Sequence, residues 1–199
     1  MGQYSLLKDE EINFNFGGIN IPVKFKQRVR SRRSYLYAKD EYIVVVLFRK
    51  SDFPSIIYRR LPYVLDELYK IQQDFWSKEL RKYKENFKPM SMDDLKRISK
   101  ETVLLHKKTY GYKIEPNVIL QRSKEYLGWY ANNNVFIEID LAMERLNEDM
   151  FRYLMIHELT HRFFRDHSQG FWDEVSRFYP NYGYYEAMIQ YINDFWKKI

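Results

Sequence analysis

The chain of 199 residues has no cysteine. This absence excludes disulfide bonds, a thiol nucleophile and zinc sites built from cysteine, so reactive chemistry must come from other side chains. Histidine, glycine and proline are also scarce, with four, seven and six residues. A chain with this composition, 45% hydrophobic and 18% aromatic, is neither disordered nor collagen-like. We expect one globular domain with a sizeable core and room for a small accessory lobe.

Long apolar runs are missing as well. The longest purely apolar stretch covers residues 43–48, whereas a membrane-spanning helix needs about 20 such residues. The N-terminus has no apolar signal core, and Leu6 stands where an N-myristoylation motif has serine or threonine. These features predict a cytoplasmic protein that does not enter a membrane.

Three of the four histidines lie within eleven residues, in the motif His-Glu-Leu-Thr-His at 157–161 and at His167. Residues four apart on an α-helix share a face, with Cβ atoms about 5–6 Å apart. The imidazoles of His157 and His161 can therefore converge on one zinc ion, with Zn–N bonds of about 2.0–2.1 Å. Glu158 lies at the edge of that face, where a general base acts on metal-activated water. A catalytic zinc needs a third protein ligand and an open position, and His167 is the predicted third ligand.

The surrounding sequence predicts that this motif is helical. Asn147 is a candidate N-cap, and Glu148 and Asp149 follow in the first turn, where carboxylates favour the positive end of the helix dipole. Apolar residues then recur at helical spacing, at Met150, Phe151, Leu154, Met155 and Leu159. A buried helix with two hydrogen-bonded histidines would show the same pattern, but the third histidine favours a metal site.

Other residues near the motif compete for these roles. The carboxylates of Asp166, Asp173 and Glu174 are alternatives to His167, or partners that hold a ligand imidazole. A tyrosine after the motif could donate a hydrogen bond to an oxyanion, although packing is the simpler explanation in a chain with 18 tyrosines. The candidates are Tyr179, Tyr182, Tyr184 and Tyr185. The fourth histidine, His106, is predicted to be structural.

The order of the expected elements indicates an α+β fold. Strands are expected at residues 12–16, 19–30, 35–38, 42–48, 113–121, 127–130 and 135–139. Helices are expected at residues 62–87, 91–110, from 147 through the histidine motif at 157–161, at 168–179 and at 185–198. The order predicts an N-terminal β segment, long connecting helices, and a small mixed sheet packed on the metal-binding helix, as in zincins. We divide the chain into an accessory segment (1–60), connecting helices (61–110) and a catalytic domain (111–199).

The net charge of +6 comes mainly from residues 24–33, which hold six basic residues and no acidic one. On a strand, four of the six share one face: Lys24, Lys26, Arg28 and Arg30. This face could contact phosphate or nucleic acid weakly. However, the sequence shows no aromatic platform beside this face. In addition, any half-exposed strand alternates charged and apolar residues in this way.

From about residue 104 onwards, the chain resembles the YgjP-like metallopeptidase-domain family, a relative of the SprT-like zinc peptidases. The resemblance rests on the motif at 157–161, on His167-Ser168 followed by Phe171-Trp172, and on Tyr-Pro-Asn-Tyr at 179–182. It extends more weakly to the basic β segment and the long helix after it. Family members usually carry a stretch like Arg-Trp-Gly-Ser-Cys before the strand that precedes the metal helix. This chain has Tyr-Leu-Gly-Trp at 126–129 instead.

The resemblance implies a zinc-dependent hydrolase with His157, His161 and His167 as ligands, and some family members are linked to hydrolysis of nucleotide triphosphates. Metzincin peptidases also place a third histidine six residues after the second, but they have a glycine midway, where this chain has Phe164. We therefore expect the helix to continue past Arg162.

Together these patterns predict a zinc metallopeptidase that acts on peptides or proteins, in which Glu158 takes a proton from water and passes it to the leaving group. The strand at 135–139 is expected to be a sheet edge along which an extended peptide binds. The alternatives are a nucleotide or phosphoester hydrolase on the same metal, and a nucleic-acid- or protein-binding module with structural zinc. A second acidic metal cluster would favour phosphoester chemistry, and the sequence shows none.

Overall fold

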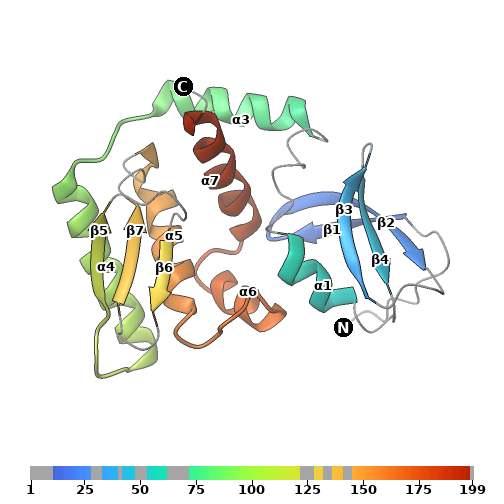
Figure 1. The fold of residues 1–199 in the computed structure, drawn as a ribbon. Coiled ribbons are helices and arrows are strands. Elements are labelled where there is room, and N and C mark those ends of the chain that lie inside the picture. Colours follow the sequence, from blue (N-terminus) through green and yellow to red (C-terminus); the bar gives the residue numbers. More distant parts are fainter. Residues whose placement is uncertain are drawn as a thin grey trace.

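The computed structural model describes residues 11–27, 33–39, 42–47, 53–61, 72–121, 128–131, 136–140 and 145–197. It confirms the predicted α+β class, with one sheet in each half of the chain (Figure 1). The N-terminal elements are β1 (Glu11–Phe16), β2 (Ile19–Gln27), β3 (Tyr35–Lys39), β4 (Tyr42–Leu47) and α1 (Phe53–Arg60). The later elements are α3 (Gln73–Asn86), α4 (Met92–Tyr110), β5 (Asn117–Gln121), β6 (Gly128–Ala131), β7 (Phe136–Asp140), α5 (Glu148–Thr160), α6 (Gln169–Ser176) and α7 (Tyr182–Lys197).

The N-terminal sheet has the strand order β1-β2-β4-β3. The predicted hairpin of β1 and β2 is confirmed, and its turn residues Gly17 and Gly18 have φ of 50° and 91°. A two-residue hairpin turn with positive φ at both positions favours glycine, because side chains are strained there. Strand β2 also pairs with β4 in parallel, from Val23 onwards, which the sequence did not indicate. Residues 28–32, at the end of the predicted second strand, lie outside the described part of the chain.

Before residue 90, one predicted helix differs from the structure and another helix was not predicted. The connecting helix expected at 62–87 is not continuous, because Gln72 has non-helical φ and ψ of −117° and 38° and α3 begins after it. Residues 62–71 are not among those described. Helix α1 was not expected at all, although Pro54 in its first turn is a helix-start signal. The buried side chains of Ile56 and Ile57 add α1 to the core of the N-terminal half.

Helix α4 begins and ends as predicted. Ser91 and Asp94 form a reciprocal capping box, in which each side chain accepts a hydrogen bond from the backbone N–H of the other residue. At the other end, Gly111 adopts the left-handed conformation with φ of 68°. These signals are local in sequence, which is why the pattern of residues was sufficient to place both ends.

The second sheet has the strand order β5-β7-β6. Strand β7 pairs with β5 in parallel and with β6 in antiparallel fashion. It is therefore the central strand, and the prediction that residues 135–139 form an edge was wrong. The edge strand that contacts α5 is β6. The prediction relied on β7 coming directly before the metal helix in the sequence. Because β7 has a paired strand on each side, β5 and β6 are the edge strands of this sheet among the described residues.

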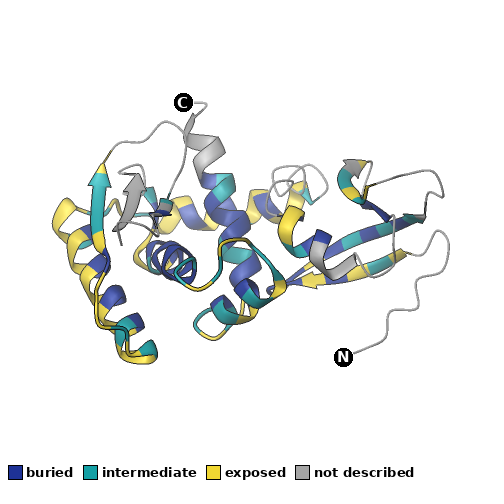
Figure 2. Cartoon of the chain, turned by 60° about the horizontal axis from the view of Figure 1, so that its bottom comes forward, coloured by how far each residue is buried: buried dark blue, intermediate teal, exposed yellow. Residues whose placement is uncertain are grey.

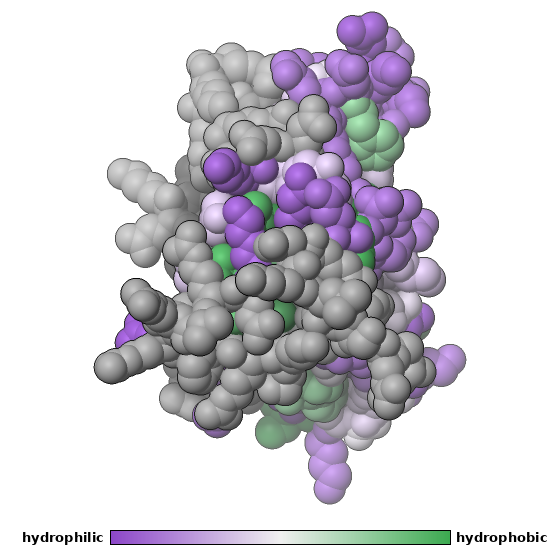
Figure 3. Space-filling model, turned by 90° about the vertical axis from the view of Figure 1, so that its right-hand side faces the viewer, coloured by the Kyte–Doolittle hydropathy of each residue, from purple (hydrophilic) through white to green (hydrophobic). Residues whose placement is uncertain are grey.

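Helix α5 is the most deeply buried helix, because ten of its thirteen residues are buried (Figure 2). Helices α6 and α7 lie between the two sheets (Figure 1). Among the described residues, none of the helices combines the length and the apolar character that crossing a membrane requires. At the end that carries the N-terminal sheet, the described atoms in view are mostly hydrophilic, with small hydrophobic patches (Figure 3).

The tip of the N-terminal hairpin packs on the start of α7 and on α6. The ring of Phe16 makes edge contacts with Trp172 and with Tyr182, each with ring centroids 5.1 Å apart. The backbone N–H of Gly183 donates to the carbonyl of Gly17 at 2.9 Å. The division of the chain into three segments stays a prediction, but the accessory segment shares one hydrophobic core with the helices beside the histidine motif.

Candidate metal centre

Helix α5 starts as predicted and ends earlier than predicted. The Asn147 side chain accepts a hydrogen bond from the N–H of Met150 at 2.9 Å, which confirms the N-cap. The helix was expected to continue past Arg162, but it ends at Thr160. The next residues form a tighter turn, with the N–H of Phe163 donating to the carbonyl of Thr160 at 3.0 Å. A tightened last turn needs no positive φ, so the chain reverses here without a glycine.

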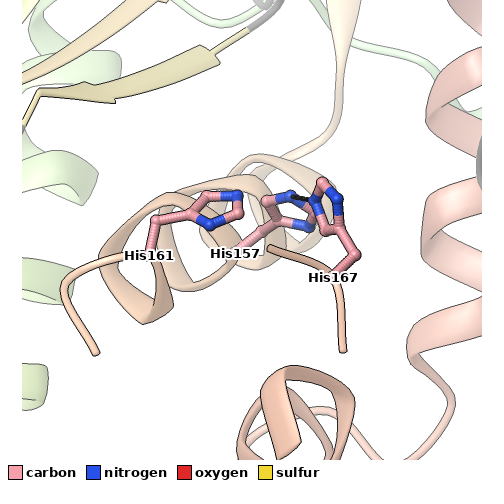
Figure 4. A group of neighbouring side chains, drawn as sticks. All are labelled: His157, His161 and His167. Carbon is pink, nitrogen blue, oxygen red and sulfur yellow. Dashed lines mark hydrogen bonds between the residues drawn. The ribbon is translucent and has the colours of Figure 1, made fainter. Parts of the chain in front are cut away.

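The three predicted histidines come together at the end of α5 (Figure 4). One ring nitrogen from each of His157, His161 and His167 lies within 4.8 Å of the others. The Nε2 atoms of His157 and His167 are 3.0 Å apart. His161 Nδ1 lies 3.0 Å from the carbonyl oxygen of Phe164, and because a carbonyl only accepts, this nitrogen carries the hydrogen. Its Nε2 is therefore left with a free lone pair.

This group has the size and the surroundings of a metal site. Four ligands at tetrahedral positions around zinc are about 3.3 Å from one another, given Zn–N bonds of 2.0–2.1 Å. The 3.0 Å separation of His157 and His167 is close to that value. The Phe171 ring lies 4.7 to 4.9 Å from all three imidazoles and covers one side of the group. Three imidazoles that converge in this way fit a divalent transition metal such as zinc.

Burial keeps two of the histidines neutral. Burial, together with the nearby His157, lowers the pKa of His161 to about 3 and that of His167 to about 4. His157 differs, because burial lowers its pKa but the carboxylates of Glu186 and Glu158 together outweigh burial and raise it. Neutral imidazoles with free lone pairs are the form that binds a metal.

Glu158, the predicted general base, is buried against the edge strand. Burial raises its pKa to about 7, and Glu186 contributes in the same direction. A Cβ added to Gly128 of β6 would lie 2.6 Å from Oε1 of Glu158, so the strand backbone contacts the carboxylate directly. One turn further along the chain, Arg162 donates to the hydroxyl of Tyr130 in the same strand at 3.3 Å. Strand β6 therefore lies beside the end of α5, with its glycine next to Glu158.

Sequence reasoning missed Glu186 and the role of Gly128. Glu186 lies in α7, where its carboxylate accepts from the hydroxyl of Tyr153 at 2.6 Å and lies 3.5 Å from Nδ1 of His157. The signal was a single acidic residue directly before the apolar run Ala187-Met188-Ile189, all of it buried. An acid at such a position is costly unless it has a partner, which is a reason to search for one.

The alternative ligands lie outside the histidine group. Asp166 pairs with Arg59 at 3.0 Å, and Glu174 pairs with Arg177 at 3.0 Å, while Asp173 is exposed. His106 is fully buried beside the ring of Tyr110, with centroids 4.5 Å apart, far from the motif in sequence and not in the group.

The four tyrosines after the motif are occupied by packing and hydrogen bonds. Tyr182 stacks on Trp172, Tyr184 donates to Glu79 at 3.0 Å, and Tyr179 and Tyr185 both donate to Asp149. These contacts favour the packing explanation over a role at the oxyanion.

The basic face of β2 is only partly described. Lys24 pairs with Glu11 at 2.9 Å and lies over the ring of Tyr42 at 3.5 Å. Lys26 is half-buried on the same face, while Arg28 and Arg30 lie outside the described residues.

Two tyrosines that the pattern of β2 did not indicate lie on the same face of the sheet as these charges. The register places Tyr37 beside Val44, which pairs with Lys24, and Tyr35 beside Val46, which pairs with Lys26. Paired residues point to the same face of a sheet. The two tyrosine rings stack with centroids 6.1 Å apart. They come from another strand, so the pattern of β2 alone did not reveal them.

A helix that carries two histidines and a buried glutamate, with a third histidine folded back onto it, is the arrangement by which metallopeptidases hold a metal beside a base. The comparison with protein families agrees with this class. A family model described as YgjP-like, metallopeptidase domain, matches residues 77–190, more than half of the chain. The chain belongs to the YgjP-like metallopeptidase-domain family. Membership implies a divalent metal and peptide or protein substrates.

Two solved structures of metallopeptidase zymogens are similar to parts of the chain. Abylysin of Pyrococcus abyssi is 26% identical over 46% of this chain and 90% of its own, with a TM-score of 0.43. Jannalysin of Methanocaldococcus jannaschii is 15% identical over 49% of this chain and 96% of its own, with a TM-score of 0.42. The comparison with curated proteins gave no match.

Proposed function

We propose that this metallopeptidase is a zinc enzyme, with His157, His161 and His167 as the metal ligands and Glu158 as the general base. The observation that supports the proposal best is the convergence of three imidazoles beside a buried carboxylate. Zinc held there would act as a Lewis acid and lower the pKa of a water in its open position.

Glu158 is suited to carry a proton through the reaction. A base works best when its pKa lies near the operating pH, and burial raises the pKa of Glu158 to about 7. The carboxylate can accept a proton from the attacking water and return it to the leaving nitrogen. Gly128 limits its movement from the side of β6, because the strand backbone lies against it.

The edge of β6 is the proposed place for the substrate. Strand β6 pairs with β7 on one side only, within the described residues, and so leaves backbone groups for an added strand on the other side. An extended peptide that pairs there would be held by main-chain hydrogen bonds, with little dependence on its side chains. The peptide would lie next to Glu158, because Gly128 belongs to that strand.

The other functions have less support. Among the described residues, the only group that could hold a metal is the histidine group, so a second acidic metal cluster for phosphoester chemistry is not seen there. Hydrolysis of nucleotides on the same metal stays an alternative, tested with nucleotide triphosphates in parallel with peptides. A cytoplasmic location stays part of the proposal, and fractionation of cells tests it.

Metal content tests the proposed site directly. We expect elemental analysis to find about one zinc per chain in the purified protein. The variants His157→Ala and His161→Ala should lose it, and His167→Ala should bind it more weakly. Asp173→Ala is the matched control and should keep its zinc. Full zinc content in both His157→Ala and His161→Ala would refute the assignment.

Binding of nucleic acid through the basic face of β2 is the second candidate, favoured by the stacked Tyr35 and Tyr37. We expect weak binding without sequence preference, which falls steeply with salt because it depends on counterion release. Fluorescence anisotropy over a salt series measures the affinity for nucleic acid. The unaltered chain is compared with Tyr35→Ser and with a variant that carries serine at all four basic positions, Lys24, Lys26, Arg28 and Arg30. Tight binding at physiological salt that the Ser variant loses would make nucleic acid a primary partner. No binding at low salt would remove this candidate.

A further inference from the structure

Glu186 is a buried carboxylate that has no lysine or arginine partner within the described part of the chain. Its side chain is 11% exposed. A buried carboxylate is costly unless it is hydrogen-bonded and balanced by a positive charge. The proposed metal site is the place beside Glu186 where such a charge would lie.

The carboxylate lies beside the Nδ1 edge of the His157 imidazole, whereas His167 lies at the Nε2 atom of that ring. Its Oε2 atom is 3.5 Å from Nδ1 of His157, and that nitrogen is buried and has no closer hydrogen-bond partner among the described residues. The opposite nitrogen of the same ring, Nε2, lies 3.0 Å from Nε2 of His167. Glu186 is therefore not one of the converging ligand atoms but faces the back of one ligand ring.

Tyr153 holds the carboxylate in this place. Tyr153, His157 and the C-cap residue His161 follow one another at intervals of four residues, so they lie along one face of α5 and its C-terminal end. The Tyr153 hydroxyl donates to the same Oε2 atom of Glu186 at 2.6 Å. The tyrosine is fully buried, and its ring stacks on Tyr185 with centroids 5.2 Å apart. Packing thus fixes the hydroxyl, and the hydroxyl fixes the carboxylate.

We propose that Glu186 is a positioning residue for the metal ligand His157. Its carboxylate accepts the hydrogen of Nδ1, which selects the tautomer with a free lone pair on Nε2 and holds that lone pair toward the metal. Its negative charge also makes Nε2 of the imidazole a stronger electron-pair donor to the metal. Tyr153 supports this role from the side remote from the metal. The inference rests on the proposed metal site, and it adds helix α7 to the elements that build that site.

Zinc affinity of Glu186→Gln tests the proposal without reliance on activity. The amide keeps the shape but carries no charge, so we expect zinc to bind about 10- to 100-fold more weakly in competition with a chelator. Glu79→Gln is the matched control, because Glu79 also accepts from a tyrosine hydroxyl, at 3.0 Å from Tyr184, but does not belong to the histidine group or contact it among the described residues. The control should bind zinc as the unaltered chain does. Unchanged affinity in Glu186→Gln would overturn the proposal.

A spectroscopic readout separates positioning from a structural role. Nitrogen-15 NMR of the imidazoles should show one tautomer for His157 in the unaltered chain, with hydrogen on Nδ1, and a mixture in metal-free Glu186→Gln. If Glu186→Gln fails to fold, Tyr153→Phe replaces it, and we expect several-fold weaker zinc binding there. Full affinity in Tyr153→Phe would then overturn the proposal. An unaltered chain that binds no zinc would instead refute the metal site itself.

Discussion

At the scale of single residues, the metal centre depends on side chains whose charges are set by burial. The three clustered histidines and Glu158 were predicted, because their spacing along one helix has a direct geometric meaning. Glu186 was not, because its contact with His157 depends on how α7 packs on α5. Long-range packing of this kind leaves only a weak trace in the sequence, here one acidic residue next to an apolar run.

His106 allows a test of burial at this scale that is independent of the metal. Burial lowers its pKa to about 4, whereas the unfolded chain has the ordinary value near 6.5. Between these values the unfolded state binds the extra proton, so the free energy of unfolding falls as the pH falls. We expect this residue to cost about 2 kcal/mol of stability between pH 7 and pH 5. Urea unfolding with a chelator present, comparing the unaltered chain with His106→Phe, measures the difference.

The variant should lose less stability in acid than the unaltered chain, because phenylalanine fills the same aromatic cluster without titrating. An equal loss in both proteins would show that His106 is not buried in its neutral form.

At the scale of elements, the ends of helices were predicted where a local signal exists and missed where none does. The capping box at Ser91 and the left-handed Gly111 define α4 in the sequence itself. The early end of α5 at Thr160 was missed, because no glycine or proline marks it. The place of β7 within its sheet was also missed, since strand order follows from pairing partners that are distant in sequence.

Two glycine variants should separate activity from stability. In Gly128→Ala the new Cβ would lie 2.6 Å from the Glu158 carboxylate, which must move. We expect full metal content and little loss of stability, because the end of a side chain moves easily, but at least about tenfold slower peptide hydrolysis, since misplaced groups lose rate steeply. Gly111→Ala is the control: nothing lies near its Cβ, but its φ of 68° strains alanine by about 1 kcal/mol.

Thermal unfolding and initial rates of hydrolysis measure both effects. A Gly128→Ala protein with an unchanged rate would show that β6 does not restrict Glu158. Slower hydrolysis in Gly111→Ala would show that the assay reports stability rather than the site.

At the scale of the whole molecule, the N-terminal sheet is joined to the metal centre through a chain of aromatic contacts. Phe16 packs on Trp172, and Trp172 stacks on His167 with centroids 5.5 Å apart. The α+β class and the order of elements were predicted from the sequence. The contact of the hairpin tip with α6 and α7 could not be predicted from the sequence, because no repeated pattern connects residues so far apart.

Gly183→Ala tests this connection. Its Cβ would lie 1.8 Å from the carbonyl oxygen of Phe16, a backbone atom that can move only if the hairpin moves. We expect a loss of about 2–4 kcal/mol in the free energy of unfolding, as for other severe overpacking. Zinc affinity should also fall, since Trp172 would lose the contact with Phe16. Chemical denaturation and chelator competition measure the two effects, and a variant with unchanged stability would show that the two halves do not pack as described.

The most direct test of the central claim is the rate of peptide hydrolysis by zinc-loaded Glu158→Gln, measured against the unaltered chain on one unbiased peptide library. The amide keeps the shape of the side chain but cannot accept the proton of the attacking water. We expect equal zinc content, an intact fold and hydrolysis slower by about 10²- to 10⁴-fold. An undiminished rate in the variant would contradict the assignment of Glu158 as the base, and with it the proposed peptidase site.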